Sequence, residues 1–113
     1  MVAVTSTKQT LAAYYATLGP YFGLATGSPG ATATPANEAS GGSYARVATT
    51  WSAGSGGVMN GSAVTVNAQA GTYTYAIMCS GASGNNMIDN VAITSTVLSA
   101  PGQIVLTPTY TQS

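Results

Sequence analysis

Turn-forming residues recur roughly every ten positions along most of this chain and leave only short segments between them. Several segments are rich in β-branched and aromatic residues: Ala63–Ala68 (AVTVNA) alternates apolar with polar positions, and Tyr73–Ser80 (YTYAIMCS) is the strongest strand signal. Short alternating segments bounded by turns are typical of an antiparallel sandwich or barrel. We therefore predict a single domain over residues 1–113 with a mainly β fold: an antiparallel β-sandwich of jelly-roll or immunoglobulin-like type over residues 20–113, preceded by one α-helix. The turns that carry this pattern are Gly27–Gly30, Ser52–Gly57, Asn60–Gly61, Gln69–Gly71, Gly81–Asn86 and Ala100–Gly102.

The chain before residue 20 has a helical pattern instead. We predict a helix over residues 5–19, in which Ser6 and Gln9 form a capping box that satisfies free amides of the first turn. Gly19 stands where a left-handed C-terminal cap belongs, and Pro20 cannot continue a helix. Four large side chains repeat at i, i+3, i+4 and i+7 and share one face. This face is a candidate interface with the rest of the domain or with a neighbouring subunit, and it consists of Leu11, Tyr14, Tyr15 and Leu18.

Individual side chains set the details of the predicted strands. A strand that starts at Tyr44 runs to Trp51, the only tryptophan, which we expect to anchor the core. Asn60-Gly61 predicts a hairpin turn because both residue types tolerate positive φ. Pro108 cannot donate to a sheet, so the last strand should end at a sheet edge. The remaining predictions are strands at Tyr21–Thr26, Met87–Leu98 (as one or two strands) and Gln103–Tyr110, an extended loop at Ala31–Ala39, and one strand face shared by Tyr73, Tyr75, Ile77 and Cys79.

Charge is almost absent from the sequence. Charged residues make up 4% of the chain, against roughly a quarter in ordinary soluble domains. The net charge is zero, which removes the attraction on which binding to nucleic acid and to anionic membranes mostly rests. A surface without net charge is also poorly protected against association. We therefore expect neither a nucleic-acid nor a membrane partner, and a protein that works docked on other proteins or on copies of itself.

Two of the few charged residues, Glu38 and Arg46, lie close together on either side of Gly41-Gly42. We interpret them as a structural ion pair that holds the preceding loop against the strand starting at Tyr44, because structural pairs also produce such acid–base constellations. The two glycines would supply the turn between the charges. The predicted structural motif comprises Asn37, Glu38, Gly41, Gly42, Tyr44 and Arg46.

The side chains that catalysis usually needs are scarce. The sequence has no histidine, one cysteine and two carboxylates, too few to assemble a zinc site plausibly. A serine nucleophile would lack a histidine base, and Glu38 with Asp89 is the only carboxylate pair for glycoside hydrolysis. We therefore predict no enzymatic activity, no catalytic or metal-binding residue and no cofactor. Cys79 follows two apolar residues and is interpreted as a small buried side chain rather than a reactive thiol.

A series of short motifs resembles small structural proteins of tailed bacteriophages. The most specific part is Asn37-Glu38, followed by Gly41-Gly42 and Tyr44-Ala45-Arg46. The sequence departs from the pattern at Ala25, where such proteins often carry His, and near Cys79, where they often carry Trp. The resemblance covers nearly the whole chain and also includes Pro29-Gly30, Thr50-Trp51, the Leu18-Gly19 helix exit and Thr107–Tyr110.

The resemblance implies a virion component with a β-sandwich fold. It leads to the hypothesis of a capsid (head) decoration protein that binds the major capsid protein and reinforces its lattice through many apolar contacts. Two alternatives stay open: a minor tail or tail-fibre protein, and a carbohydrate- or receptor-binding module that uses the Ala31–Ala39 loop and the tyrosines. Neutral charge and an apolar helix face would also allow self-association, for example as a trimer. The expected location is the virion, after assembly in the host cytoplasm, since Met1–Thr5 lacks the basic start of a secretion signal.

Overall fold

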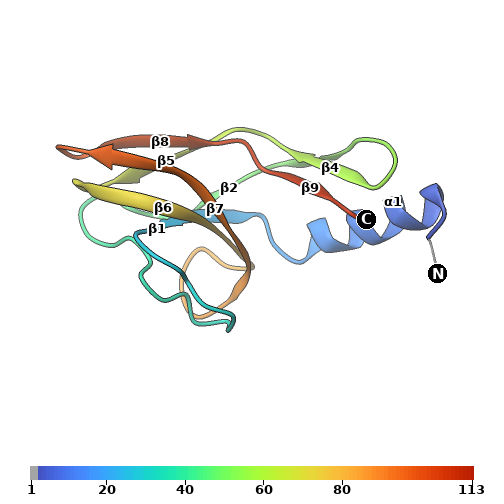
Figure 1. The fold of residues 1–113 in the computed structure, drawn as a ribbon, viewed down its shortest axis with the longest axis horizontal. Coiled ribbons are helices and arrows are strands. Elements are labelled where there is room, and N and C mark those ends of the chain that lie inside the picture. Colours follow the sequence, from blue (N-terminus) through green and yellow to red (C-terminus); the bar gives the residue numbers. More distant parts are fainter. Residues whose placement is uncertain (1–2) are drawn as a thin grey trace.

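A computed structural model of the chain describes residues 3–113 and is mainly β, with antiparallel sheets and one helix near the N-terminus (Figure 1). The predicted fold class is thereby confirmed, while the assignment of residues 1–113 to a single domain stays a prediction. Residues 1 and 2, which begin the segment considered for a secretion signal, lie outside the described residues. The molecule is elongated, with extents of 47 × 25 × 22 Å. Its elements are α1 Thr5–Thr17, β1 Tyr21–Ala25, β2 Val47–Ala48, β3 Trp51–Ala53, β4 Val58–Gly61, β5 Val64–Ala68, β6 Gly71–Cys79, β7 Met87–Leu98, β8 Gly102–Leu106 and β9 Thr109–Thr111.

Two antiparallel sheets face each other and enclose the main core. One has the strand order β2-β1-β6-β7, and the other pairs β5 with β8 (Figure 1). The alternation in β5 accounts for this packing, since Val64 and Val66 are buried whereas Thr65 between them is exposed. The core draws on both layers, with Phe22, Leu24, Tyr73 and Met78 from the larger sheet and Val64, Val66, Ala68 and Ile104 from the smaller one.

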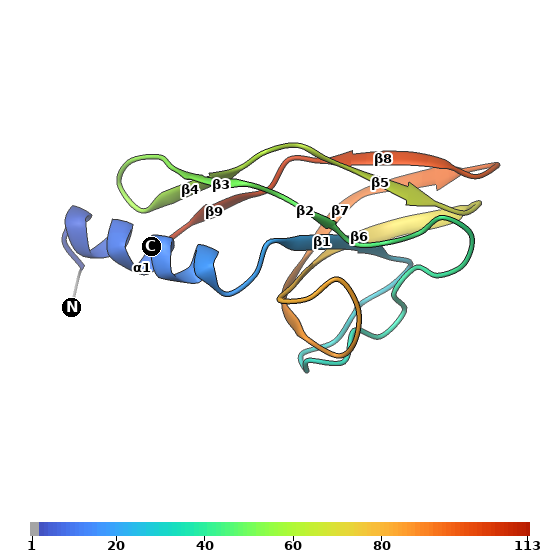
Figure 2. The same cartoon turned by 180° about the vertical axis from the view of Figure 1, so that it is seen from behind.

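A third sheet, β3-β4-β9, lies beside α1 at one end of the molecule (Figure 2). The helix packs through small side chains, because Ala12 and Ala16 are buried against Met59. Gln9 ties the helix to the turn before β4: its Oε1 accepts a hydrogen bond from the amide of Gly57 (3.0 Å), and its Nε2 donates to the carbonyl of Val58 (3.1 Å). The helix therefore lengthens the molecule along its long axis instead of covering the sandwich.

The chain passes from the sandwich into the third sheet at two places, and both divide a predicted strand. The segment predicted as one strand from Tyr44 to Trp51 contains β2, which pairs with β1, and β3, which pairs with β4. Thr49 lies between them and takes part in neither pairing: its amide donates to the carbonyl of Pro20 and its hydroxyl to the carbonyl of Ser62. The predicted strand Gln103–Tyr110 is divided into β8 and β9 at Pro108, which has no amide hydrogen with which to continue a ladder.

The helix is confirmed, but both predicted caps are wrong. The N-cap residue is Val4, without a side-chain cap, because Gln9 is engaged with β4 and not with the first turn. At the other end the helix stops in right-handed geometry, and Gly19 is not among the residues with positive φ. Gly19 is required for space instead, since a Cβ there would overlap the carbonyl oxygen of Cys79. Contacts with the strands therefore determine where the helix begins and ends.

The predicted hairpin turn at Asn60-Gly61 is also wrong. Both residues lie inside β4 and pair with β3, and the turn between these strands is made by the preceding glycine-rich segment. Gly56 and Gly57 have φ of 69° and 97° there, a region that glycine adopts at little cost. Gly61 again provides room, because a Cβ would lie 2.6 Å from the ring of Pro108.

Strand β6 contains an irregularity that simple alternation does not anticipate. Its register with β7 shifts between Tyr73 and Tyr75. Tyr73 consequently joins the core between the sheets, whereas Tyr75, Ile77 and Cys79 pack in a separate cluster. A bulge of this kind reverses the alternation of side chains, so the predicted face of four residues is wrong at Tyr73.

Candidate functional site

Glu38 and Arg46 form a bidentate ion pair beside the larger sheet. Arg46 Nε donates to Glu38 Oε2 and Arg46 Nη2 donates to Glu38 Oε1, both at 2.8 Å. The guanidinium also donates to three oxygen atoms of the loop between β6 and β7. These are the carbonyl oxygens of Gly81 (3.1 Å) and Gly84 (2.9 Å) and the side-chain oxygen of Asn86 (2.9 Å). The pair therefore joins two loops that are distant in the sequence.

Tyr44 completes this cluster. Its hydroxyl donates to Glu38 Oε2 (2.8 Å) and accepts from the amide of Leu24 (3.2 Å). Gly23 in β1 permits the approach, because a Cβ there would overlap the hydroxyl, and a glycine inside a strand often marks such close contact. The segment before Val47 thus serves the cluster and is not a strand, so the predicted strand start at Tyr44 is too early.

Arg46 is the buried member of the cluster, whereas Glu38 and Tyr44 are partly exposed. Arg46 is 7% exposed, and its hydrogen bond to Glu38 raises the pKa of the guanidinium against the opposing effect of burial. Burial, followed by the hydrogen bond to Glu38, raises the pKa of Tyr44 well above its ordinary value of 10.0. Each charged or polar group serves as a partner for another, which suits a structural role better than a chemical one.

The other members of the predicted motif shape the backbone around the pair. Asn37 has φ of 60°, in the left-handed region that asparagine tolerates, and its Nδ2 donates to the carbonyl of Ser28 (3.0 Å). Gly41 and Gly42 have φ of 87° and 56°, so the turn between the two charges favours residues without a Cβ. The structure brings the six motif residues together, and their role as a determinant of the fold stays a prediction.

The four side chains of the predicted helix interface do not all lie in the same environment. Tyr15 lies against the body of the molecule, where its ring contacts β9, while the other three side chains face solvent. Their use as an interface stays a prediction. The exposed members are Leu11 (45%), Tyr14 (67%) and Leu18 (39%).

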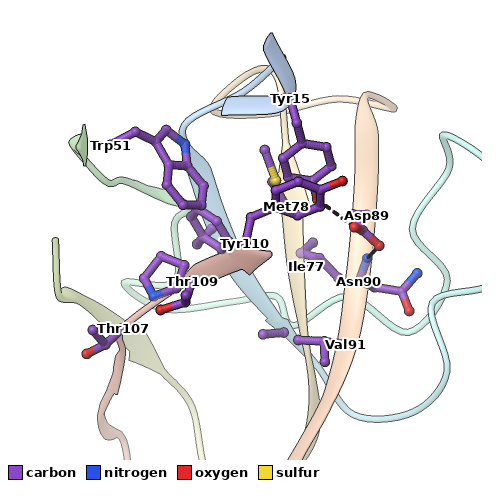
Figure 3. Close-up of a pocket in the computed structure, with 13 residues that line it drawn as sticks. Tyr15, Trp51, Ile77, Met78, Asp89, Asn90, Val91, Thr107, Thr109 and Tyr110 are labelled. Atoms are coloured by element: carbon purple, nitrogen blue, oxygen red, sulfur yellow. Dashed lines mark hydrogen bonds between the residues drawn. The ribbon is translucent and has the colours of Figure 1, made fainter. Parts of the chain in front are cut away.

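An open groove of about 500 Å³ lies between β7 and the segment that leads into β9 (Figure 3). Its apolar lining includes Phe22, Ala76 and Met78 from the inner strands of the larger sheet. Polar and aromatic side chains stand around it. They are Tyr15, Trp51, Asp89, Asn90, Thr107, Thr109 and Tyr110.

Tyr15 joins the helix to both sides of this groove. Its ring stacks on Tyr110, with centroids 3.6 Å apart and planes 11° apart. Its hydroxyl donates to Asp89 Oδ2 at 2.5 Å (Figure 3), and the other carboxylate oxygen accepts from the amide of Asn90 (2.8 Å). Burial, followed by the bond to Asp89, raises the pKa of Tyr15 well above its ordinary value of 10.0. Elements α1, β7 and β9 therefore meet at one polar point on the groove.

Sequence reasoning does not identify this groove. Trp51 is predicted as a core anchor, but it is only partly buried: its ring packs edge-on against Phe22 (centroids 5.9 Å apart) and its Nε1 donates to the carbonyl of Gly19 (3.2 Å). The one signal in the sequence is Asp89, a lone carboxylate in the otherwise uncharged segment Met87–Leu98. Most of the loop Ala31–Ala39, proposed as a binding loop, projects away from β5 and β8 (Figure 1), but its last residue, Ala39, is buried in the main core.

The structure offers no grouping for metal chemistry: among residues 3–113, no three His, Cys, Asp or Glu side chains lie close enough to hold a metal ion. Within the same part of the chain, no helix has the length and apolar character to cross a membrane.

Comparison with known families decides the class of protein. Residues 6–109 match the family described as podophage GP4 fiber I protein gp80. The chain belongs to this family. Comparisons with curated proteins and with solved structures find no match. This member of the fiber I family is thus a structural protein of the phage virion, and the match favours the fibre alternative over the head-decoration hypothesis, for which it offers no support.

Proposed function

We propose that this fiber I family member is a building block of a tail fibre. The family match carries the proposal, because it extends over residues 6–109 and so includes the helix and nearly all of the strands. The elongated shape, 47 Å along one axis against 25 and 22 Å along the others, suits a module arranged along a fibre. Its partners would then be other proteins of the tail, and its location the virion.

Its contribution would be mechanical and not enzymatic. The ion pair of Glu38 and Arg46 joins two loops over the larger sheet through a partly buried bidentate contact. Gln9 and Tyr15 join the helix to β4 and β9. Such cross-links between distant segments resist local opening, which a fibre under tension requires.

Copies of the chain would associate through the exposed side of α1. Leu11 and Leu18 are seven residues apart with Tyr14 between them, and Val4 continues the spacing at the N-cap, where Leu18 is the C-cap residue. We call these four residues the helix stripe; Val4 is 64% exposed. A seven-residue apolar repeat is the pattern by which helices pack in coiled coils. Because the chain has no net charge, copies would approach without repulsion, and a trimer is the assembly we propose.

The test of the fibre assignment is the location and copy number of the protein on the particle. Quantitative mass spectrometry of purified virions should give a number of copies far below that of the major capsid protein, and antibody-gold labelling should mark the tail. Hundreds of copies with label distributed over the head would overturn the proposal.

A further inference from the structure

We propose that the groove between β7 and the β8–β9 segment binds a linear, neutral oligosaccharide. The inference stands on the geometry of the groove and does not require the fibre assignment. No residue of the Ala31–Ala39 loop lines the groove, so the site differs from the binding loop expected from the sequence.

The groove is longer than the cavity described above. A second cavity of about 320 Å³ lies alongside the first, toward Val105 on β8. The two share five lining residues and so form one continuous groove along the open edge of the sandwich. The shared residues are Phe22, Ala76, Val91, Thr107 and Pro108. Cavities of about 300–1,000 Å³ with an apolar lining and a few polar groups are typical ligand sites, and an elongated one suits a chain-like ligand.

The end of the groove near the helix has the side chains that a sugar ring requires. Sugar rings present C–H groups on their faces and hydroxyl groups around their rims, so they bind where an aromatic surface lies next to hydrogen-bonding groups. Trp51 and Tyr110, both partly exposed, contribute aromatic rings, although Tyr15 covers one face of Tyr110. Thr107 and Thr109 contribute hydroxyl groups (Figure 3).

Asp89 provides a preorganised acceptor beside these rings. One carboxylate oxygen accepts from the hydroxyl of Tyr15 (2.5 Å) and the other from the amide of Asn90 (2.8 Å). These two bonds orient the carboxylate but use only part of its hydrogen-bonding capacity, because a carboxylate offers about four acceptor positions. The remaining positions can accept hydrogen bonds from sugar hydroxyl groups.

The charge of the groove selects neutral over acidic glycans. Neither cationic side chain of the chain, Lys8 or Arg46, lines the groove, whereas Asp89 does. A uronic acid or a phosphate placed there would meet a like charge with no cation to compensate it. The same reasoning disfavours nucleic acids.

The test uses the single tryptophan as a reporter of occupancy. The full-length protein is titrated with oligosaccharides from an array of neutral and uronic-acid-containing bacterial glycans, and the fluorescence of Trp51 is followed. We expect saturable binding of at least one neutral glycan, with a Kd in about the millimolar range or tighter, and none of its acidic counterparts.

Two matched variants localise the binding. Val91→Glu places a charged side chain in the groove at a residue that is 61% exposed, and Val97→Glu places the same charge on the same strand at a residue that is 70% exposed and outside the groove lining. The first should weaken binding at least tenfold and the second should not change it. Asp89→Ala should also weaken binding, while circular dichroism checks that each variant is folded.

Three results would overturn the proposal. One is the absence of binding across the whole array at concentrations of about 10 mM, well above an ordinary weak Kd. Another is equal binding by the Val91→Glu and Val97→Glu variants, which would place the glycan elsewhere. The third is a change of oligomeric state in Val91→Glu without a change in glycan affinity, which would show that a second copy of the chain occupies the groove. None of these results would affect the fibre assignment, which rests on the family match.

Discussion

The rings of Tyr15 and Tyr110 lie almost parallel, with centroids 3.6 Å apart. This contact joins α1 near the start of the chain to β9 near its end. Because the hydroxyl of Tyr15 also donates to Asp89 in β7, one side chain connects the helix to two strands of different sheets. Tyr15 therefore adds a link from the helix to β7 and β9, beside the packing of Ala12 and Ala16 on Met59.

Substitutions at Tyr15 should separate the two contacts. Tyr15→Phe keeps the ring stack and loses the hydrogen bond, which should cost about 1 kcal/mol of unfolding free energy. Tyr15→Ala also loses the stack and the apolar packing, which should cost about 2–4 kcal/mol. Urea unfolding followed by circular dichroism measures both values. Thr7→Ala, at an exposed position of α1 outside the helix stripe, is the control and should stay within about 0.5 kcal/mol. Equal losses in Tyr15→Phe and Tyr15→Ala would contradict a role for the stack.

Removal of the carboxylate of Glu38 should be strongly destabilising. Arg46 is buried, and Glu38→Ala would leave its guanidinium without a counter-charge, at a cost of about 3–5 kcal/mol. Arg46→Lys keeps the charge, but an ammonium cannot make the bidentate contact and reach the loop carbonyls together, so we expect a loss of about 1–3 kcal/mol. Thermal unfolding measures both variants, with Lys8→Gln as a control for charge alone. An unchanged melting temperature in Glu38→Ala would refute the structural role of the ion pair.

The fold class and most strand positions follow from local sequence signals. Val64 and Val66 alternate with exposed residues because one face of β5 covers the core, and this is visible in the sequence. The points where the prediction fails are set by partners far along the chain. Gly61 looks like a turn residue, yet it is needed because Pro108 packs against its backbone. Gly19 looks like a helix cap, yet its place is dictated by the backbone of Cys79.

The ion pair of the candidate site could be inferred from the sequence, whereas the groove could not. Glu38 and Arg46 are conspicuous because so few charges surround them, and they lie on one loop. The groove combines Tyr15, Asp89 and Tyr110 from three separate elements. No local pattern links such distant positions, and their proximity results from the way the helix and β9 pack on the sandwich edge.

Alkaline pH should destabilise the protein because the fold holds a thiol and two tyrosine hydroxyl groups in their protonated forms. Burial raises the pKa of the Cys79 thiol from 9.0 to about 11, so folding disfavours the thiolate. The stability that the protonated Cys79 thiol contributes is therefore complete below pH 9.0, and it is lost as the pH rises toward about 11. Tyr15 and Tyr44, whose pKa values are also raised, act in the same direction. Urea midpoints measured at increasing pH should fall through this range.

The same burial should protect Cys79 from thiol reagents. Because the side chain is 0% exposed and its raised pKa keeps it protonated at neutral pH, an aromatic disulfide reagent should label it only when the protein opens. Labelling should be fast in denaturant, and in buffer its rate should follow the unfolding equilibrium. Rapid stoichiometric labelling of the folded protein would show that the thiol is accessible.

Self-association through the helix stripe should depend on Leu11. Leu11→Glu places a charge in the middle of the seven-residue repeat, where copies would have to bury it, and a buried unpaired charge is costly. Ala13→Glu introduces the same charge at an exposed helix position outside the stripe, and it should leave assembly unchanged. Sedimentation velocity over a range of protein concentrations should show the trimer for the natural protein and for Ala13→Glu, and monomer for Leu11→Glu. Both variants should unfold at similar urea concentrations when monomeric, because neither position contributes to the core. Retention of the trimer in Leu11→Glu would exclude the helix stripe as the contact between copies.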